Sequence, residues 1–81
     1  MSYMQALAVF IAVAEEKSFS AAAKKLSLTQ PTVSFHIDGM ERKFGCPLFI
    51  LTRRGAELTV YGRTLYENTR DVQDLLDRTE R

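Results

Sequence analysis

Residues 27–35 of the chain, SLTQPTVSF, place small hydrogen-bonding side chains and one aromatic ring at the start of a predicted helix. A glutamine amide such as that of Gln30 can pair with the edge of adenine, and the hydroxyls of Thr32 and Ser34 can reach bases or phosphates. An aromatic ring such as Phe35 can touch the methyl group of thymine. Backbone N–H groups near Thr29 would also favour a phosphate. This pattern indicates a surface that contacts DNA.

The same residue types also have a purely structural explanation. Gln, Thr and Ser are common in the first turn of any helix because they compete well for backbone hydrogen bonds, and a neighbour could cover Phe35. His36 lies at the border of core and surface with no partner Asp, Cys or second His, which favours a structural role. Asp38 and Glu41 would need a cleft to act as general acid and base, and 81 residues hardly permit one. We therefore expect no enzyme activity.

Length and composition favour one small globular domain. The chain has 81 residues, of which 46% are hydrophobic and 26% are charged, and this balance supports a single core. Its one cysteine, Cys46, is expected to serve packing, so we expect no disulfide, no metal site and no cofactor. No apolar run approaches the roughly 20 residues of a membrane span, and no signal peptide is evident. We expect a cytoplasmic protein without membrane contacts.

Charge divides along the chain. Residues 17–66 contain eight basic and three acidic side chains, a net charge of +5, whereas residues 67–81 contain three arginines and five acids, a net charge of −2. The basic part could face a polyanion, although most such faces are simply solvated. The acidic tail favours water or another protein.

Two helices are predicted before residue 27. The first runs from a capping box at Ser2 and Gln5 to about residue 16. Its apolar stripe, expected in the core, comprises Met4, Leu7, Phe10, Ile11 and Ala14. The second helix is capped by Ser20 and ends near residue 26, and Leu28 in the polar break that follows should point inward.

A third helix is predicted from Thr29, its cap, to residue 44, where Gly45 stops it. Pro31 falls in the first turn, where its missing N–H costs nothing. The face expected in the core comprises Val33, Ile37, Met40 and Phe44. The face expected to be exposed comprises Pro31, Phe35, Asp38 and Arg42. Two helices joined by a short turn form the helix-turn-helix arrangement, in which the start of the second helix enters the DNA major groove.

The hydrophobic period changes after Gly45 and Pro47. The runs LFIL and AEL, separated by TRRG, predict a two-stranded hairpin whose basic turn carries Arg53 and Arg54. Gly55 is available for the positive φ of such a turn. The hairpin should therefore present both arginines on a protruding loop.

Thr59 caps a predicted final helix that runs to the C-terminus over about 22 residues, or roughly 33 Å. An apolar seam along it comprises Leu65, Val72, Leu75 and Leu76, with Thr79 in the same seven-residue register. Such a seam favours a homodimer through this helix, and a two-fold dimer would bind an interrupted inverted repeat. The alternative is a solvated helix, because the segment also contains Asp71, Asp74 and Asp77.

The segment FSAAAKKLSLTQPTVSFHIDGMERKFGCPLFILTRRGAELTVYGRTL resembles the N-terminal DNA-binding domain of LysR-type transcriptional regulators. The shared features are an alanine-rich second helix, the TQPTVS start of the third, the GCPLF segment and the LT turn before the last helix. The resemblance implies a mainly α fold. It would contain a winged helix-turn-helix of three helices and a two-stranded β-hairpin wing at residues 1–58. A long linker and dimerisation helix would follow at residues 59–81.

The resemblance also implies roles for individual residues. It assigns to the major-groove surface Gln30, Pro31, Thr32, Ser34 and Phe35. It assigns Arg53 and Arg54 to the wing near the DNA backbone or minor groove, and makes Ser27 and Thr29 phosphate contacts. The chain departs from the usual pattern at Phe35, where polar or basic side chains are frequent, at Leu51, where many members have arginine, and at Met40, which replaces leucine.

Double-stranded DNA and a second copy of the chain are therefore the expected partners, with a tetramer in a longer parent chain. Members of this family usually continue into a large α/β domain, so a small-molecule effector is expected only if a separate effector domain exists. Two alternatives remain open. One is a winged-helix module for protein–protein contacts, which would have no need of Arg53 and Arg54 at a protruding tip. The other is the DNA-binding domain of a molybdate-responsive type of regulator.

Overall fold

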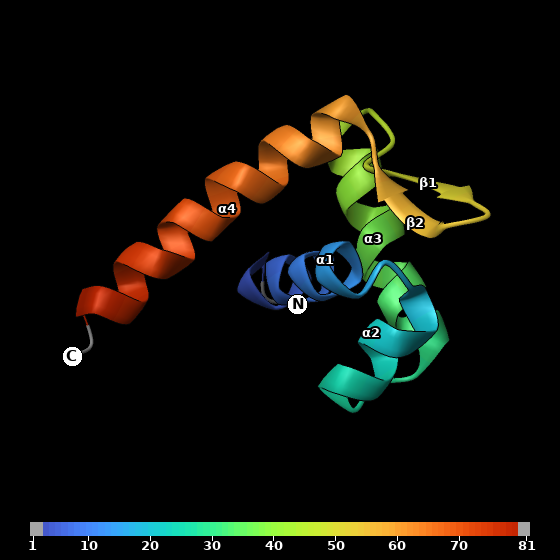
Figure 1. Ribbon diagram of the computed structural model, residues 1–81, viewed down its shortest axis with the longest axis horizontal. Coiled ribbons are helices and arrows are strands. Elements are labelled where there is room, and N and C mark those ends of the chain that lie inside the picture. Colours follow the sequence, from blue (N-terminus) through green and yellow to red (C-terminus); the bar gives the residue numbers. More distant parts are fainter. Residues whose placement is uncertain (1–2, 80–81) are drawn as a thin grey trace.

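The computed structural model describes residues 3–79, which form four helices and one two-stranded antiparallel sheet (Figure 1). In chain order the elements are α1 (Tyr3–Glu16), α2 (Phe19–Leu26), α3 (Gln30–Phe44), β1 (Phe49–Thr52), β2 (Gly55–Leu58) and α4 (Val60–Thr79). The hairpin of β1 and β2 lies at one end of α3, and α4 extends from the same end to the side of the body (Figure 1). The predicted order of elements is confirmed.

The centre of the core is α1, which is apolar on more than one side. Residues 9–13, VFIAV, are all buried, and Val9, Phe10 and Val13 are almost fully so. The predicted stripe left out Val9 and Val13, because a helix covered by α2, α3 and α4 has no single buried stripe. The stripe is also wrong at Met4, which is 60% exposed in an exposed first turn. The predicted capping box at Ser2 lies outside the described residues.

Two serines could cap α2, and the structure uses Ser18 rather than the predicted Ser20. The Ser18 hydroxyl accepts the N–H of Ala21 at 3.0 Å. Ser18 has the extended backbone of an N-cap (φ −161°, ψ 129°), whereas Ser20 is already inside the helix. The prediction was wrong because Lys17, with φ 57°, reverses the chain directly after α1 and starts α2 two residues early.

The turn between α2 and α3 is held at both ends. Ser27 adopts the left-handed conformation (φ 58°), and its N–H bonds back to carbonyls in the last turn of α2. Thr29 caps α3 as predicted, since its hydroxyl accepts the N–H of Thr32 at 3.3 Å and Pro31 occupies the first turn. Leu28 packs inward against the core, also as predicted. The two helices therefore form a helix-turn-helix.

The inner face of α3 is buried at Val33, Ile37 and Met40, as predicted. The prediction is wrong at Phe44, which is 41% exposed. Phe44 lies in the last turn of α3, where its neighbours belong to the segment before β1 and to α4, and its ring lines an open hollow there. His36, predicted at the border of core and surface, is only 5% exposed and belongs to the core.

The base of the wing is part of the core. Phe49, opposite Leu58 in the antiparallel register, is buried. Its ring centroid lies 5.4 Å from that of Phe10 in α1 and 5.9 Å from that of Phe19 in α2. These aromatic contacts fix the start of β1 against two helices.

The start of β2, next to the tip of the wing, is hydrogen-bonded to the turn between α1 and α2. Ala56 donates its N–H to the carbonyl oxygen of Lys17 at 3.0 Å. Gly55 has φ 108°, and a Cβ at this residue would lie 2.3 Å from the same oxygen. Only glycine fits this backbone and this close approach. The wing is therefore held at a defined distance from the helix-turn-helix.

A tight corner joins the wing to α4. The N–H of Thr59 donates to the carbonyl of Leu48 at 3.0 Å, and its hydroxyl donates to the carbonyl of Pro47 at 2.7 Å. The same hydroxyl accepts the N–H of Gly62 at 3.0 Å, so Thr59 caps α4 as predicted. From α3, the Glu41 carboxylate accepts the N–H of Leu48 at 2.7 Å. The start of α4 is thus fixed to the body.

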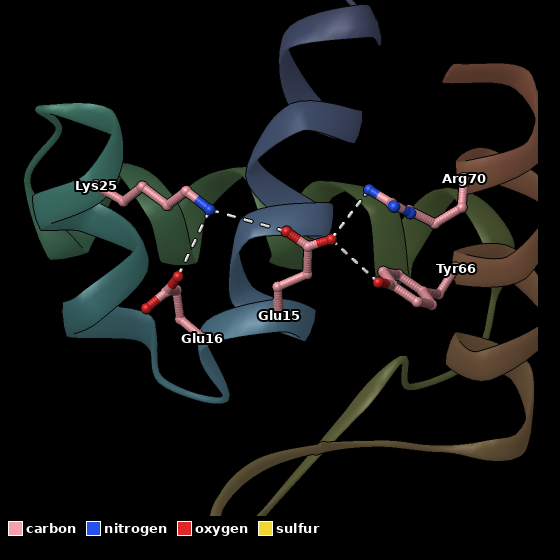
Figure 2. Close-up of polar contacts among 5 residues, drawn as sticks. All are labelled: Glu15, Glu16, Lys25, Tyr66 and Arg70. Carbon is pink, nitrogen blue, oxygen red and sulfur yellow. Dashed lines mark hydrogen bonds and ion pairs between the residues drawn. The ribbon is translucent and has the colours of Figure 1, made fainter. Parts of the chain in front are cut away.

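About two to three turns later, α4 meets α1 at Glu15 (Figure 2). One Glu15 carboxylate oxygen accepts the Tyr66 hydroxyl at 3.1 Å and Nη1 of Arg70 at 3.2 Å. The other oxygen faces Nζ of Lys25 in α2 at 3.8 Å, and Lys25 also pairs with Glu16 at 3.5 Å. A single carboxylate on α1 therefore contacts both α2 and α4.

The surroundings of Tyr66 favour the protonated form of its hydroxyl. Burial, then the hydrogen bond and charge of Glu15, raise the pKa of Tyr66 above its ordinary value, while Arg70 lowers it and Asp74 raises it. A pKa raised on folding means that the folded state holds this proton more tightly. The stabilisation is complete below about pH 10 and is lost as pH rises through the raised pKa.

Replacing Gly62 with Ala should destabilise the fold. A Cβ there would lie 2.1 Å from the Leu48 carbonyl oxygen and 3.0 Å from Cδ2 of Leu58, so the corner must shift. Forcing extra atoms into a packed site typically costs about 1–3 kcal/mol. Urea unfolding of both chains measures the difference.

Gly39→Ala is the matched control, because nothing lies within 4 Å of a Cβ at Gly39. Alanine is more stable than glycine inside a helix by about 0.5–1 kcal/mol, so this variant should be stabilised. Equal effects of the two substitutions would mean that the corner at Gly62 imposes no steric constraint.

Candidate nucleic-acid interface

The start of α3 is accessible at the residues predicted to contact DNA. Gln30, Pro31 and Phe35 are exposed, and Thr32 and Ser34 are half-buried. Phe35 is 55% exposed, so the alternative in which a neighbour covers its ring is wrong. These side chains belong to the first turns of α3, on the side of the helix away from the core.

The turn before α3 presents Ser27 and Thr29, both exposed. The Thr29 hydroxyl accepts the N–H of Thr32 and lies 2.9 Å from the Thr32 hydroxyl, so these two side chains form one hydrogen-bonded pair. The N-terminal end of a helix carries partial positive charge from its aligned peptide dipoles. A phosphate near this turn would therefore be stabilised.

A hollow of about 570 Å³ lies between the outer side of α3 and the wing. Gln30, Ser34 and Asp38 line it from α3, and Leu51 lines it from β1. The hollow is also lined by residues 17–20, at the end of the α1–α2 turn and the start of α2, and by Thr52, Gly55 and Ala56 of the wing. The structure thus brings two predicted base contacts and the wing to the same concave surface.

The tip of the wing carries two adjacent cations. Arg53 and Arg54 are exposed in the turn between β1 and β2. The N–H of Arg54 donates to the Thr52 hydroxyl at 3.1 Å, and that hydroxyl in turn donates to the Glu57 carboxylate. Within the described part of the chain, neither arginine takes part in an ion pair. Both guanidinium charges are therefore available to a partner.

The sequence did not assign a contact role to several residues that adjoin this surface. Ile50 and Leu51 are 55% and 75% exposed, although both belong to the apolar run LFIL. The signal for Leu51 was its departure from the arginine usual at that position. Lys17 and Ser18 carried no such signal, because only the sharp chain reversal after α1 places them beside the hollow.

Other candidates for chemistry have structural surroundings. Nδ1 of His36 is buried and has no hydrogen-bond partner, and Cys46 is a half-buried free thiol. The Glu41 carboxylate binds backbone N–H groups. Among residues 3–79 with described side chains, no group of three His, Cys, Asp or Glu could hold a metal ion, and none of the helices is long and apolar enough to cross a membrane.

The predicted dimerisation seam is only partly described. Leu65 is half-buried and packs against the core, and Leu75 is 59% exposed. The remaining seam side chains, which lie outside the described ones, are those of Val72, Leu76 and Thr79. The seam therefore begins on the body of the domain and continues along α4 beyond it.

A smaller hollow of about 290 Å³ adjoins the start of this seam. Tyr61, Leu65 and Asn68 line it from α4, and Phe44 and Leu48 line it from the body. Tyr61 is 62% exposed and Phe44 is 41% exposed. The first turns of α4 thus present an accessible, largely apolar face.

Comparison with known proteins identifies the family of this fold. Residues 4–63 match the family described as "Bacterial regulatory helix-turn-helix protein, lysR family". The chain belongs to the LysR family. This family consists of transcriptional regulators rather than enzymes, and the match favours it over the molybdate-responsive alternative.

Two curated regulators illustrate the similarity. The helix-turn-helix regulator ClcR of Pseudomonas putida is 45% identical over 74 residues, which are 91% of this chain and 24% of ClcR. A regulator of Methanocaldococcus jannaschii is 42% identical over 80 residues, which are 99% of this chain and 26% of that protein. The chain therefore spans about a quarter of the length of these relatives.

Solved structures agree with this assignment. The CbnR DNA-binding domain, determined as a DNA complex, has a TM-score of 0.85 and 34% identity, with 98% of this chain and 91% of that chain covered. The BenM DNA-binding domain with benA site 1 DNA has a TM-score of 0.88 and 31% identity, with 96% and 88% covered. The predicted winged helix-turn-helix fold is confirmed, and this LysR-family chain is a DNA-binding domain of a transcriptional regulator.

Proposed function

We propose that this domain binds specific double-stranded DNA sequences, with the start of α3 in the major groove and the wing tip at the backbone or minor groove. The observation that carries the proposal is the hollow between α3 and the wing, which has side chains that can pair with bases on one side. Gln30 and Ser34 would pair with base edges, and Phe35 would contact a thymine methyl or a sugar. Arg53 and Arg54 would meet phosphates or a narrow minor groove.

Four further residues would position the domain. Ser27 and Thr29, exposed in the turn before α3, would contact phosphates. Pro31 and Thr32 would lie against the wall of the major groove. The DNA complexes of the CbnR and BenM domains support this docking, because those domains share the fold of this chain.

We also propose a homodimer through α4. Positions alternate by four and three residues, the spacing of a coiled-coil seam, at Tyr61, Leu65, Asn68, Val72, Leu75 and Thr79. Leu76 lies beside this seam. The exposed apolar hollow at the start of α4 supports the pairing, because it extends the same face onto the body. A two-fold dimer would present two α3 helices to an interrupted inverted repeat.

The longer protein adds two further expectations. Dimers would associate into a tetramer in a longer parent chain, and a small-molecule effector would bind only where a separate effector domain exists. Residues 1–58 would form the DNA-binding unit, and residues 59–81 would form the linker and dimerisation helix. The regulator would act in the cytoplasm, where the chromosome of a prokaryotic cell lies.

Selection of bound sequences from random duplexes tests the proposal directly with the 81-residue chain. Enrichment of one inverted repeat, with half-site centres about one helical turn or a multiple of it apart, is the expected result. Recovery of unrelated sequences with equal affinity would contradict specific recognition. Enrichment of single, unpaired half-sites would contradict the dimer alone.

Replacing Arg53 and Arg54 with Ala should weaken binding to every duplex. Each lost phosphate contact reduces the slope of log affinity against log salt by about 0.9. Titrations at several salt concentrations, on selected and random DNA, measure both effects. Arg78→Ala, which removes a positive charge from the far end of α4, is the control and should change the slope little. An unchanged slope in the double variant would exclude the wing as a phosphate contact.

Gln30→Ala should reduce preference at one or two base pairs in each half-site. Loss of a good pair between a side chain and a base costs about 1–3 kcal/mol. Repeating the selection with the variant identifies the positions that lose preference. Gln5→Ala, which removes an exposed amide from α1, is the control. An equal loss of affinity for selected and random DNA would make Gln30 a backbone contact instead.

Val72→Asp combined with Leu76→Asp should yield folded monomers that bind the full site far more weakly. Two carboxylates in an apolar seam would have to be desolvated on pairing. Sedimentation measures the association, and circular dichroism checks the fold. Arg78→Glu changes the net charge by the same two units outside the seam and should remain dimeric. A monomeric unmodified chain that still fills both half-sites cooperatively would show that the cooperativity comes through the DNA.

A further inference from the structure

We propose that Glu15 sets the direction in which α4 leaves the DNA-binding unit, and thereby the half-site spacing that a dimer accepts. The second part of this inference rests on the proposed dimer. Glu15 is a positioning residue, since it lies on α1 and acts through its contacts with other side chains (Figure 2).

Besides the packing of Leu65 and Tyr66 against the core, two polar contacts restrain the line of α4. The first is the corner, where Thr59 binds the carbonyls of Pro47 and Leu48. The second is the Glu15 carboxylate, which accepts both the Tyr66 hydroxyl and the Arg70 guanidinium. Tyr66 and Arg70 are one turn apart on the same face of α4. The Glu15 contact lies further along α4 than the corner, so the two contacts together restrict the direction of the helix.

The same carboxylate also relates α4 to the helix-turn-helix. Its second oxygen faces Lys25, which lies in the last turn of α2, at 3.8 Å. The negative charge of Glu15 thus lies between the positive charges of Lys25 and Arg70 (Figure 2). Without that negative charge, nothing in this group would draw Arg70 toward α1, and Lys25 would retain Glu16 as its partner at 3.5 Å.

A small change of direction has a large effect at the end of a long helix. The 20 residues of α4 rise about 1.5 Å each and span about 30 Å. A tilt of about 7° would move the far end by more than 3 Å, roughly the rise of one base pair. If two copies pair along this helix, its direction therefore decides where the second α3 meets the DNA.

The contact is suited to positioning rather than to holding the fold together. The side chains of Glu15, Lys25 and Arg70 retain 31%, 51% and 43% exposure. Exposed ion pairs contribute little to stability. The core around Phe10 and Val13 does not include these charges. Loss of the carboxylate should therefore free α4 while leaving the core folded.

Distances within one chain test the direction of α4 without DNA. Spin labels are placed at Lys24→Cys in α2 and Arg78→Cys in α4, in a Cys46→Ser background and diluted with unlabelled chain. We expect Glu15→Gln to widen the distance distribution at least twofold. Glu16→Gln, which removes the neighbouring carboxylate that pairs with Lys25 only, should leave the distribution unchanged. An unchanged width in Glu15→Gln would overturn the inference.

Two further measurements distinguish positioning from general destabilisation. In Glu15→Gln, the pKa of Tyr66 should fall toward its ordinary value, as followed by phenolate absorbance against a Tyr66→Phe reference. Exchanging the charges, with Glu15→Arg and Arg70→Glu together, should narrow the distance distribution relative to either single change. A double variant as broad as the singles would mean that the ion pair does not direct α4.

The consequence for DNA is measured on the selected inverted repeat with spacers lengthened or shortened by one to three base pairs. The unmodified chain should prefer one spacing by about tenfold, and Glu15→Gln should reduce this preference to threefold or less. An equally sharp preference in Glu15→Gln would overturn the link to spacing. A flat profile in the unmodified chain would overturn the dimer proposal, while the distance measurement would still decide whether Glu15 directs α4.

Discussion

The burial of α1 on several sides is the constraint on which the rest of this domain depends. Five consecutive residues, 9–13, are buried, with at most 9% of any one exposed, so α1 must be surrounded by other elements. α2, α3 and α4 pack around it, and the wing reaches it through Phe49, which contacts Phe10. Within residues 3–79, no second layer of elements covers the outer sides of α3 and the wing. The start of α3 and the wing tip are exposed for this reason.

The turn after α1 fixes the wing and the helix-turn-helix relative to each other. The Lys17 carbonyl accepts the N–H of Ala56, and Gly55 permits the close approach. Ser18, the next residue, caps α2, which leads into α3. The wing and the helix-turn-helix are thus fixed to adjacent residues of one turn, and the hollow between them has a width set by backbone contacts. Its chemistry then depends on exposed side chains such as Gln30 and Leu51.

Local sequence signals predicted the helices and strands well. The predictions failed where contacts between residues distant in the sequence determine a helix start or the burial of a side chain. Thr29 capped α3 as predicted because its cap bond is local. Phe44 was predicted to be buried but is 41% exposed, because a helical wheel does not show where the neighbouring helices end. Ser20 was predicted as the cap of α2 where the structure uses Ser18, and the positive φ at Lys17 that places the cap at Ser18 is a result of tertiary packing. The contact of Glu15 with α4 joins residues 51 and 55 positions apart, and no spacing pattern could indicate it.

The buried and exposed sides of α3 carry different residues, so the exposed side chains can change without changing how the helix packs. α3 packs on the core through Val33, Ile37 and Met40, whereas Phe35 is 55% exposed and contributes little to this packing. Substitutions on the exposed side of a packed helix usually change stability by no more than about 0.5 kcal/mol. The outer residues can therefore differ among relatives while the frame that orients them stays the same. If Phe35 contacts DNA as proposed, an unusual residue at this position would alter the DNA preference rather than the fold.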